Sequence, residues 1–140
     1  MKLIVDANIL VSGLLKDGIT RELLLHNDLE LFTPEFIYIE FFNHIQELAK
    51  KAKMDTKLFK EYADFLIAES NIKIMTKKEV IPFINKAENI SPDPDDVQYV
   101  AAALTMQCAV WSNDKALKRQ NDVKILSTTD LIQIMKIKTR

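Results

Sequence analysis

The 140-residue sequence contains one cysteine, two histidines, two glycines and four prolines, and these low numbers limit what the protein can be. Cys108 cannot form a disulfide within the chain, which fits a reducing compartment, and its apolar surroundings favour a structural thiol over a nucleophile. The histidines, His26 and His44, show no metal-ligand spacing, which argues against a zinc site. Glycine and proline only punctuate the chain and form no low-complexity segment or linker.

A surplus of positive charge and a long apolar run are also absent. The formal net charge is −1, so general neutralisation of nucleic-acid phosphates by Lys and Arg is excluded, and any contact with nucleic acid must be local. No stretch approaches the roughly 20 apolar residues that cross a bilayer. Asp6 and Asn8 interrupt the apolar N-terminal segment, and no signal-peptide cleavage site follows it. We therefore expect a cytoplasmic protein that does not contact a membrane.

The pattern of apolar residues predicts an α/β protein. With 48% hydrophobic residues, the chain has the size and composition of a single domain over residues 1–140. Short apolar segments predict strands at residues 2–5, 29–32, 72–75, 109–112 and 124–126. Helical periodicity predicts helices at residues 6–15, 19–27, 33–53, 56–69, 78–88, 95–107, 115–119 and 129–136. This alternation indicates a three-layer α/β/α sandwich with a central, mainly parallel twisted sheet.

Two aspartates directly follow predicted strands and precede predicted helices. Asp6 ends the first strand, with Asn8 close behind it, and Asp114 follows the fourth strand, whose last residue is Ser112. Capping of the next helix is enough to explain either carboxylate. A functional site is the alternative, because ligands of parallel sheets bind beyond the carboxyl ends of the strands. For Asp6 the functional interpretation is favoured, since an unpaired carboxylate in an apolar segment is unfavourable.

Three further aspartates surround Pro94. Asp93 can cap a helix that begins at Pro94, and Asp95 and Asp96 are favourable charges in its first turn, so none of them needs a function. Asp96, however, shares the side of the helix that should pack on the sheet, whereas Asp95 projects to the opposite side. Asp96 is therefore the preferred site residue, with Asp93 as its neighbour.

Glu40 lies at the edge of the apolar face of the long helix predicted at residues 33–53, with Thr33 as N-cap and Pro34 at the first helical position. Glu47 and Lys51 fall on the same strip. A polar helix border with i,i+4 pairs explains this pattern, and on the residues alone that structural interpretation is favoured.

Four acids from four segments are thus directed toward one region. Convergent carboxylates repel one another and raise each other's pKa unless a cation neutralises them. A set of oxygen ligands suits a hard divalent ion, Mg²⁺ or Mn²⁺, better than Zn²⁺. The sequence therefore predicts a metal-binding cluster of Asp6, Glu40, Asp96 and Asp114.

These motifs resemble, in order, those of the PIN domain family, the nuclease fold shared by Vap-type toxins and ribosomal RNA processing factors. Residues 5–12, VDANILVS, are similar to the opening strand and first catalytic Asp of the family, and Glu40 follows a Thr-Pro helix start. Residues 93–103, DPDDVQYVAAA, resemble the third acidic motif, and residues 112–117, SNDKAL, the fourth, with Ser where Thr is commoner. The resemblance runs from end to end.

The resemblance implies a metal-dependent endoribonuclease that hydrolyses RNA phosphodiester bonds with one or two Mg²⁺ or Mn²⁺ ions. The implied catalytic and metal-binding residues are Asp6, Glu40, Asp96 and Asp114, and the supporting residues are Asn8, Ser112 and Asp93. Basic residues near the strand ends are candidate RNA contacts: Lys16, Arg21, Lys115 and Arg119. As a toxin, the chain would pair with an antitoxin protein. A homodimer is also implied, with the apolar helices between residues 36 and 66 as candidate interface.

Other classes fit less well. A catalytically weak PIN-like module that binds RNA or protein in RNA processing is an alternative, although the presence of all four acids argues against it. A haloacid-dehalogenase-like phosphatase would need Asp-x-Asp after the first strand, where Asn8 stands, and a phosphate-accepting receiver domain would need paired acids there. The sequence is compatible with a toxin and with a processing enzyme.

Overall fold

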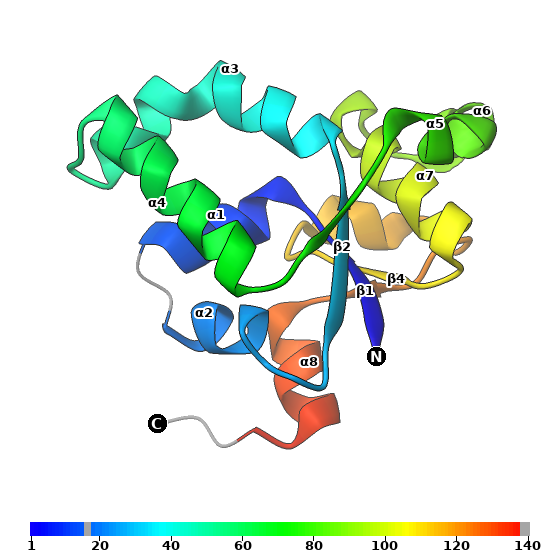
Figure 1. The fold of residues 1–140 in the computed structure, drawn as a ribbon. Coiled ribbons are helices and arrows are strands. Elements are labelled where there is room, and N and C mark those ends of the chain that lie inside the picture. The colour runs from blue at the N-terminus through cyan, green and yellow to red at the C-terminus, as the bar shows by residue number, and fades with distance from the viewer. Residues whose placement is uncertain (16–17, 138–140) are drawn as a thin grey trace.

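The computed structural model describes residues 1–15 and 18–137. Within them, five strands form one sheet in which all neighbouring strands are parallel, in the order β3-β2-β1-β4-β5 (Figure 1). The strands are β1 (Lys2–Val5), β2 (Glu30–Pro34), β3 (Lys73–Met75), β4 (Ala109–Trp111) and β5 (Ile125–Leu126). Ile4 of the central strand pairs with Phe32 of β2 and Val110 of β4. The carboxyl ends of the strands therefore lie at one edge of the sheet.

Helices occupy the connections between the strands. The first half of the chain forms α1 (Ala7–Leu15), α2 (Gly18–Leu24), α3 (Phe36–Lys51) and α4 (Thr56–Glu69). The second half forms α5 (Lys77–Val80), α6 (Ile84–Ile90), α7 (Val97–Met106) and α8 (Thr128–Met135), with short 3₁₀ turns η1 (Ile81–Phe83), η2 (Pro94–Asp96) and η3 (Lys115–Arg119). In the part of the chain that the structure describes, none of the helices is long and apolar enough to span a membrane.

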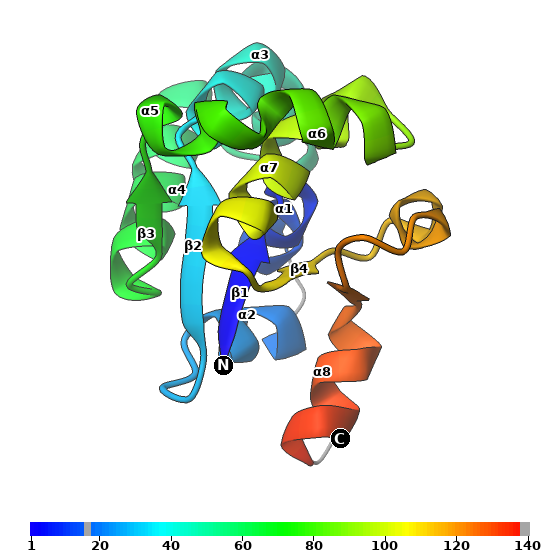
Figure 2. The ribbon, with the colours of Figure 1, turned by 90° about the vertical axis from the view of Figure 1, so that its right-hand side faces the viewer.

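The helices cover both faces of the sheet. Successive side chains of a strand point to opposite faces, so Leu3 and Val5 enter one buried cluster and Ile4 enters the other. The first cluster packs α1, α2, α3, α4 and α8 against the sheet, and the second packs α5, α6 and α7. Figures 1 and 2 show α1 and α2 on one side of β1 and α7 on the other. The predicted three-layer α/β/α sandwich with a parallel sheet is confirmed.

The start of α3 differs from the prediction that Thr33 and Pro34 begin the helix. Both residues instead end β2, and α3 begins at Phe36 after Glu35. The Thr33 hydroxyl donates a hydrogen bond to the carbonyl oxygen of Val5 at 2.8 Å, so this side chain fastens β2 to β1 rather than capping a helix. The N–H of Glu35 donates to Met75 of β3 at 2.9 Å, which continues the sheet one residue further.

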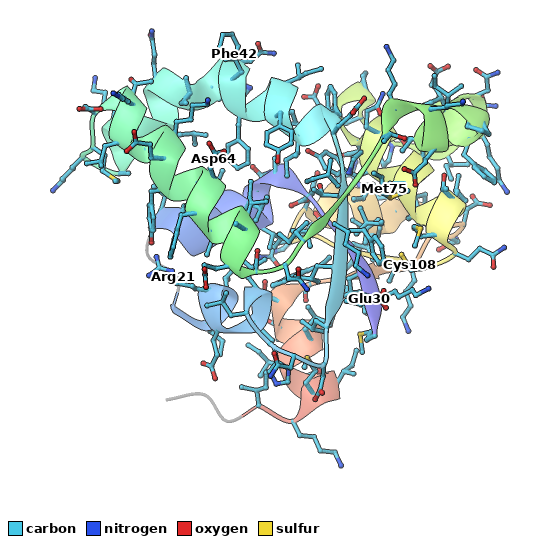
Figure 3. The ribbon with its side chains drawn as sticks, in the orientation of Figure 1. Arg21, Glu30, Phe42, Asp64, Met75 and Cys108 are labelled. Atoms are coloured by element: carbon cyan, nitrogen blue, oxygen red, sulfur yellow. The ribbon has the colours of Figure 1, made fainter. Side chains whose placement is uncertain are left out.

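Two other helices start or divide differently. The helix predicted at residues 78–88 is divided into α5, η1 and α6, because Pro82 lies at the start of a 3₁₀ turn. The helix predicted from Asp95 begins at Val97, after the turn η2. α7 ends at Met106, and its C-cap Gln107 adopts a left-handed conformation with φ of 53°. The predicted structural role of Cys108, labelled in Figure 3, agrees with its packing against the second cluster, where burial raises the pKa of its thiol.

Candidate active site

The ends of β1 and β4 bring Asp6 and Asp114 to the same edge of the sheet. The two strands are parallel neighbours, and the N–H of Asp6 donates to the carbonyl oxygen of Trp111 at 3.5 Å. Asp6 Oδ1 accepts the N–H of Ile9 at 3.0 Å in the first turn of α1. Asp114 Oδ1 accepts the N–H of Ala116 at 3.0 Å and caps η3. Both aspartates are therefore helix caps, and capping does not exclude a second role in the site.

Asp6 is held in a buried position, with 8% of its surface exposed. Burial raises the pKa of its carboxyl group above the ordinary value of 3.8, because desolvation disfavours the charged form. Hydrogen bonds from the Ser112 side chain and the Ile9 backbone lower that pKa, and the negative charge of Asp114 raises it again. Asp6 thus keeps its charge in an apolar setting only at a free-energy cost.

Ser112 and Asn113 fix the loop that carries Asp114. The Oγ of Ser112, which is fully buried, accepts the N–H of Asp114 at 3.1 Å. Asn113 Oδ1 accepts the N–H of Thr128 at 2.8 Å, and Asn113 Nδ2 donates to the Thr128 hydroxyl at 3.1 Å. These bonds attach the end of β4 to the start of α8. Asn113 was not among the predicted site residues, and its positioning role becomes visible only through this non-local contact.

Glu40 projects from α3 and is held by Tyr99 of α7. The Tyr99 hydroxyl donates a short hydrogen bond to Glu40 Oε1. Burial raises the pKa of Glu40, the bond from Tyr99 lowers it, and the charges of Asp95 and Asp6 raise it further. Burial also raises the pKa of Tyr99 far above 10, so the phenol stays a neutral donor. The ring of Phe36 packs edge-on against Tyr99, with centroids 6.2 Å apart, which fixes the phenol in place.

Asp96 is the partly buried aspartate of its segment, whereas Asp93 and Asp95 are exposed. Its Oδ2 is buried and has no hydrogen-bond partner among the described residues. Burial raises the pKa of Asp96 from 3.8 to about 7, and the charges of Asp114, Asp93, Asp6 and Asp95 contribute in that order. Asp93 serves as a cap, since its Oδ1 accepts the N–H of Asp95 at 2.9 Å. The expectation that Asp95 projects away from the site is wrong, because Asp95 lines the same cleft as Asp96 and its charge acts on Glu40. Asp96 is the more buried of the two, and its role as the third acid stays a prediction.

A cleft of about 370 Å³ contains these acids. Its lining, within residues 1–15 and 18–137, comes from α1, α3, the turn before α7 and the two strand ends: Asp6, Ala7, Asn8, Val11, Glu40, Phe41, His44, Glu47, Leu48, Lys51, Asp93, Asp95, Asp96, Tyr99 and Asp114. All four predicted catalytic acids face this one space, together with the supporting residues Asn8 and Asp93. Ser112 lies beneath the cleft and reaches it only through Asp6 and Asp114.

Among the described residues, the predicted RNA contacts Arg21, Lys115 and Arg119 do not line this cleft. Lys115 and Arg119 are exposed on η3 but are not part of the lining that the structure describes. Arg21 donates from Nε to the carbonyl oxygen of Gly13 at 2.9 Å, and its guanidinium lies 5.8 Å from the centre of the Tyr62 ring. In Figure 3 it extends from α2 toward α4. Lys16 lies outside the described residues.

The cleft instead contains basic groups that were not predicted as RNA contacts. His44 and Lys51 lie on α3 beyond Glu40, with Glu47 between them. His44 Nδ1 lies 3.9 Å from Glu47 Oε2, and Lys51 Nζ lies 3.6 Å from Glu47 Oε1. Their spacing from Glu40 places His44, Glu47 and Lys51 on one strip of α3, and this spacing can be read from the sequence. That the strip forms a wall of the cleft follows only from the packing of α3 against α1.

The donor set suits a hard divalent cation, although the acids are not gathered around one point. Most of the charged groups that face the cleft are carboxylates, and burial and mutual repulsion, which a cation would relieve, raise the pKa values of Asp6, Glu40 and Asp96. Among the described residues, no three His, Cys, Asp or Glu side chains lie close enough together to form a ready metal site. Binding of an ion would therefore require the carboxylates to draw together.

Comparison with known proteins agrees with this architecture. The chain matches the model of the PIN domain family over residues 4–133, a span that includes all four acids. Its structure is similar to that of VapBC2 from Rickettsia felis bound to a DNA fragment from their promoter, with a TM-score of 0.69 and 14% identity over 91% of this chain and 98% of that chain. No curated protein matches the sequence. At 14% identity the structural likeness concerns the fold alone, but the family match covers more than half of the chain. The chain therefore belongs to the PIN domain family.

Proposed function

We propose that this chain is a metal-dependent endoribonuclease that hydrolyses RNA phosphodiester bonds in the cleft, and that it is the toxin of a toxin-antitoxin pair in the cytoplasm. PIN domains are generally nucleases. The observation that carries the proposal is Asp96 Oδ2, which is buried without a hydrogen-bond partner in the described part of the chain and near the negative charges of Asp114 and Asp6. A carboxylate in such a place must bind either a proton or a cation.

In this proposal Asp6, Glu40, Asp96 and Asp114 hold one or two Mg²⁺ or Mn²⁺ ions. When bound, such an ion activates water and offsets negative charge on the phosphate. The protein contributes orientation, because the caps fix Oδ1 of Asp6 and of Asp114, and Tyr99 fixes Glu40. The exposed side chain of Asn8, at the cleft wall, is available to a phosphate oxygen. Ser112 and Asp93 support the loops on which the acids lie.

The test is hydrolysis of single-stranded RNA by purified protein with Mn²⁺ or Mg²⁺, and with EDTA as the metal-free control. We expect cleavage that EDTA abolishes, and a loss of more than about 100-fold in Asp6→Asn and Asp96→Asn, since even residues that only support metal ligands cost 10- to 100-fold. Asp122→Asn, an exposed aspartate outside the cleft lining, is the matched control. Wild-type rates in both cleft variants would refute the assignment.

A catalytically weak module that binds RNA or protein is the second candidate. The observation in its favour is that no three metal-binding side chains are grouped among the residues that the structure describes. The same experiment separates the two functions, because the module would bind RNA or a protein without turnover in any divalent metal.

Exposed apolar side chains on α3 and α4 supply a surface for a partner. Phe42 is 75% exposed and Phe65 is 61% exposed, and Phe42 stands out from α3 in Figure 3. An adjacent groove of about 260 Å³ is lined by both helices. Because such surfaces usually mark interaction sites, we propose that an antitoxin contacts this one, as the similarity to VapBC2 suggests.

Expression in a bacterial host tests the toxin role. Wild-type protein should arrest growth, Asp96→Asn should not, and the product of an adjacent small reading frame should restore growth. Phe42→Ser and Phe65→Ser should weaken binding of that product without changing RNA cleavage. If the isolated chain instead sediments as a dimer that Phe42→Ser dissociates, the surface belongs to a homodimer.

A further inference from the structure

The charge of the cleft is unevenly distributed along α3. The lining that the structure describes contains seven carboxylates, of which six lie around the strand ends, the start of α3 and the turn before α7: Asp6, Glu40, Asp93, Asp95, Asp96 and Asp114. The basic side chains in the same described lining are His44 and Lys51, both on α3. An RNA strand that enters the cleft therefore meets strong negative charge at one end and positive charge at the other.

The distance along α3 separates these two ends. At a rise of about 1.5 Å per residue, His44 lies about 6 Å beyond Glu40 along the helix axis, and Lys51 lies about 16 Å beyond it. Lys51 is thus too far along the helix to neutralise a phosphate that is cleaved at the acids. It is well placed for a phosphate further along the same strand, as the strand leaves the acids along the cleft.

Glu47 lies between the two basic groups on the cleft wall. Its carboxylate lies 3.9 Å from His44 Nδ1 and 3.6 Å from Lys51 Nζ, with spacings of i,i+3 and i,i+4 on the helix. The side chains are 61%, 64% and 59% exposed for His44, Glu47 and Lys51. In such solvent-exposed pairs the attraction is weak, so a phosphate can replace Glu47 as the partner of Lys51 with little loss.

A purely structural reason also exists for a lysine at this place. Cations near the C-terminus of a helix are favourable, and α3 ends with Lys50 and Lys51. Lys50 shares that position in the last turn and is exposed, but it is not part of the described cleft lining. The two neighbouring lysines therefore form a natural pair of test and control.

We propose that Lys51, assisted by His44, binds a phosphate of the same strand beyond the scissile one and so positions single-stranded RNA along α3. The inference rests on the proposed ribonuclease function and deepens it, since it names the part of the cleft that binds the strand. A chain with a net charge of −1 needs such a local contact, because its overall field does not attract RNA. Lys51 acts as a positioning residue and not as a catalytic one.

The test measures binding of a fluorescent single-stranded RNA by anisotropy, with Mg²⁺ present, in the Asp96→Asn background so that the strand stays intact. Loss of one phosphate contact lowers the slope of log K against log salt concentration by about 0.7. We expect this change in Lys51→Ala, with affinity about three- to tenfold weaker at low salt. Lys50→Ala should keep both the slope and the affinity. His44→Ala should weaken binding by a smaller factor, because an imidazole offers at most two N–H donors where the ammonium of a lysine offers three.

Two further measurements make the result specific. Glu47→Gln removes a competing negative charge, so RNA should bind about two- to threefold more tightly. In otherwise wild-type protein, Lys51→Ala should raise KM and leave kcat nearly unchanged, as expected when a contact is equally strong in substrate and transition state.

Equal salt slopes for Lys51→Ala and Lys50→Ala would overturn the inference, as would a protein that does not bind RNA. Failure of the proposed function has a different signature: the wild type binds RNA but does not cleave it with any divalent metal. In that case a lower slope for Lys51→Ala would still support the phosphate contact.

Discussion

Replacing Asp96 with asparagine removes a negative charge from the cleft and keeps the size of the side chain. The pKa of Asp96 is raised from 3.8 to about 7, mainly by burial and then by the charge of Asp114. At 1.36 kcal/mol per pH unit, the full difference corresponds to about 4 kcal/mol. Because Asp96 is only partly buried, solvent screening reduces the expected effect to about 1–2 kcal/mol.

The sign follows from which state binds more protons. Between pH 3.8 and about 7, the folded protein keeps the Asp96 proton and the unfolded chain loses it. The protonated Asp96 therefore stabilises the folded state fully below pH 3.8. This stabilisation is lost as the pH rises and is gone once the pH has passed about 7. Above that pH the wild type carries a buried charge that Asp96→Asn lacks. The free energy of unfolding of the variant should exceed that of the wild type by about 1–2 kcal/mol at pH 8, and the two should be nearly equal at pH 4.

Urea unfolding of metal-free protein in EDTA at several pH values measures this difference. Asp122→Asn, an exposed aspartate, controls for the loss of any one negative charge. A gain in stability that is the same at pH 4 and pH 8, or no gain at pH 8, would contradict the burial and charge repulsion assigned to Asp96.

Addition of metal should reverse the order of stability. An ion that binds only the folded protein stabilises it by about 2.7 kcal/mol at 100 times its dissociation constant. Mg²⁺ or Mn²⁺ should therefore raise the urea midpoint of the wild type more than that of Asp96→Asn. This readout does not depend on RNA cleavage. Equal shifts in both proteins would show that Asp96 does not bind the ion.

Three other substitutions test the supports of the site, each by urea unfolding at pH 7 with cleavage assayed in parallel. Tyr99→Phe removes the hydrogen bond to Glu40, so it should lower the free energy of unfolding by about 1 kcal/mol and slow cleavage. An unchanged cleavage rate would mean that Glu40 does not need this support. Asn113→Ala loses both bonds to Thr128 and should cost about 1–2 kcal/mol, with weaker cleavage because Asp114 is less firmly held. Thr33→Val removes a buried hydrogen bond between β2 and β1, so it should lower the free energy of unfolding by about 1–3 kcal/mol while cleavage is retained. A variant as stable as the wild type would show that the bond is dispensable.

Local rules in the sequence were sufficient for much of the fold and for the position of two cleft aspartates at the ends of strands. Asp6 and Asp114 each follow a strand and precede a helix, and both the parallel sheet and the caps follow from that arrangement. α4 has the predicted bounds because Asp55 caps it with a bond to the N–H of Leu58 and its apolar spacing is regular. These features depend on neighbours within a few residues, which a sequence displays directly.

Features that depend on distant partners were predicted less well. Thr33 and Pro34 match a helix start in isolation, but the acceptor for the Thr33 hydroxyl is on another strand. Arg21 is an ordinary basic residue in the sequence, and only packing brings it to the end of α1 and over Tyr62. Lys51 was assigned to a helix border because the sequence does not show that α1 lies opposite. In each case a contact between elements, and not the residue type, decides the role.

The double use of Asp6 and Asp114 as caps and as cleft acids has a consequence for how the protein can lose activity. Asparagine caps a helix as well as aspartate does, since its carbonyl oxygen can accept the same N–H bonds. Under the proposed function, exchange of one oxygen for an amide nitrogen at either position would therefore remove a metal ligand and leave the helices and the sheet intact. Loss of cleavage and loss of the fold are thus separable at these two positions, because the capping bond and the proposed metal bond need different properties of the same side chain.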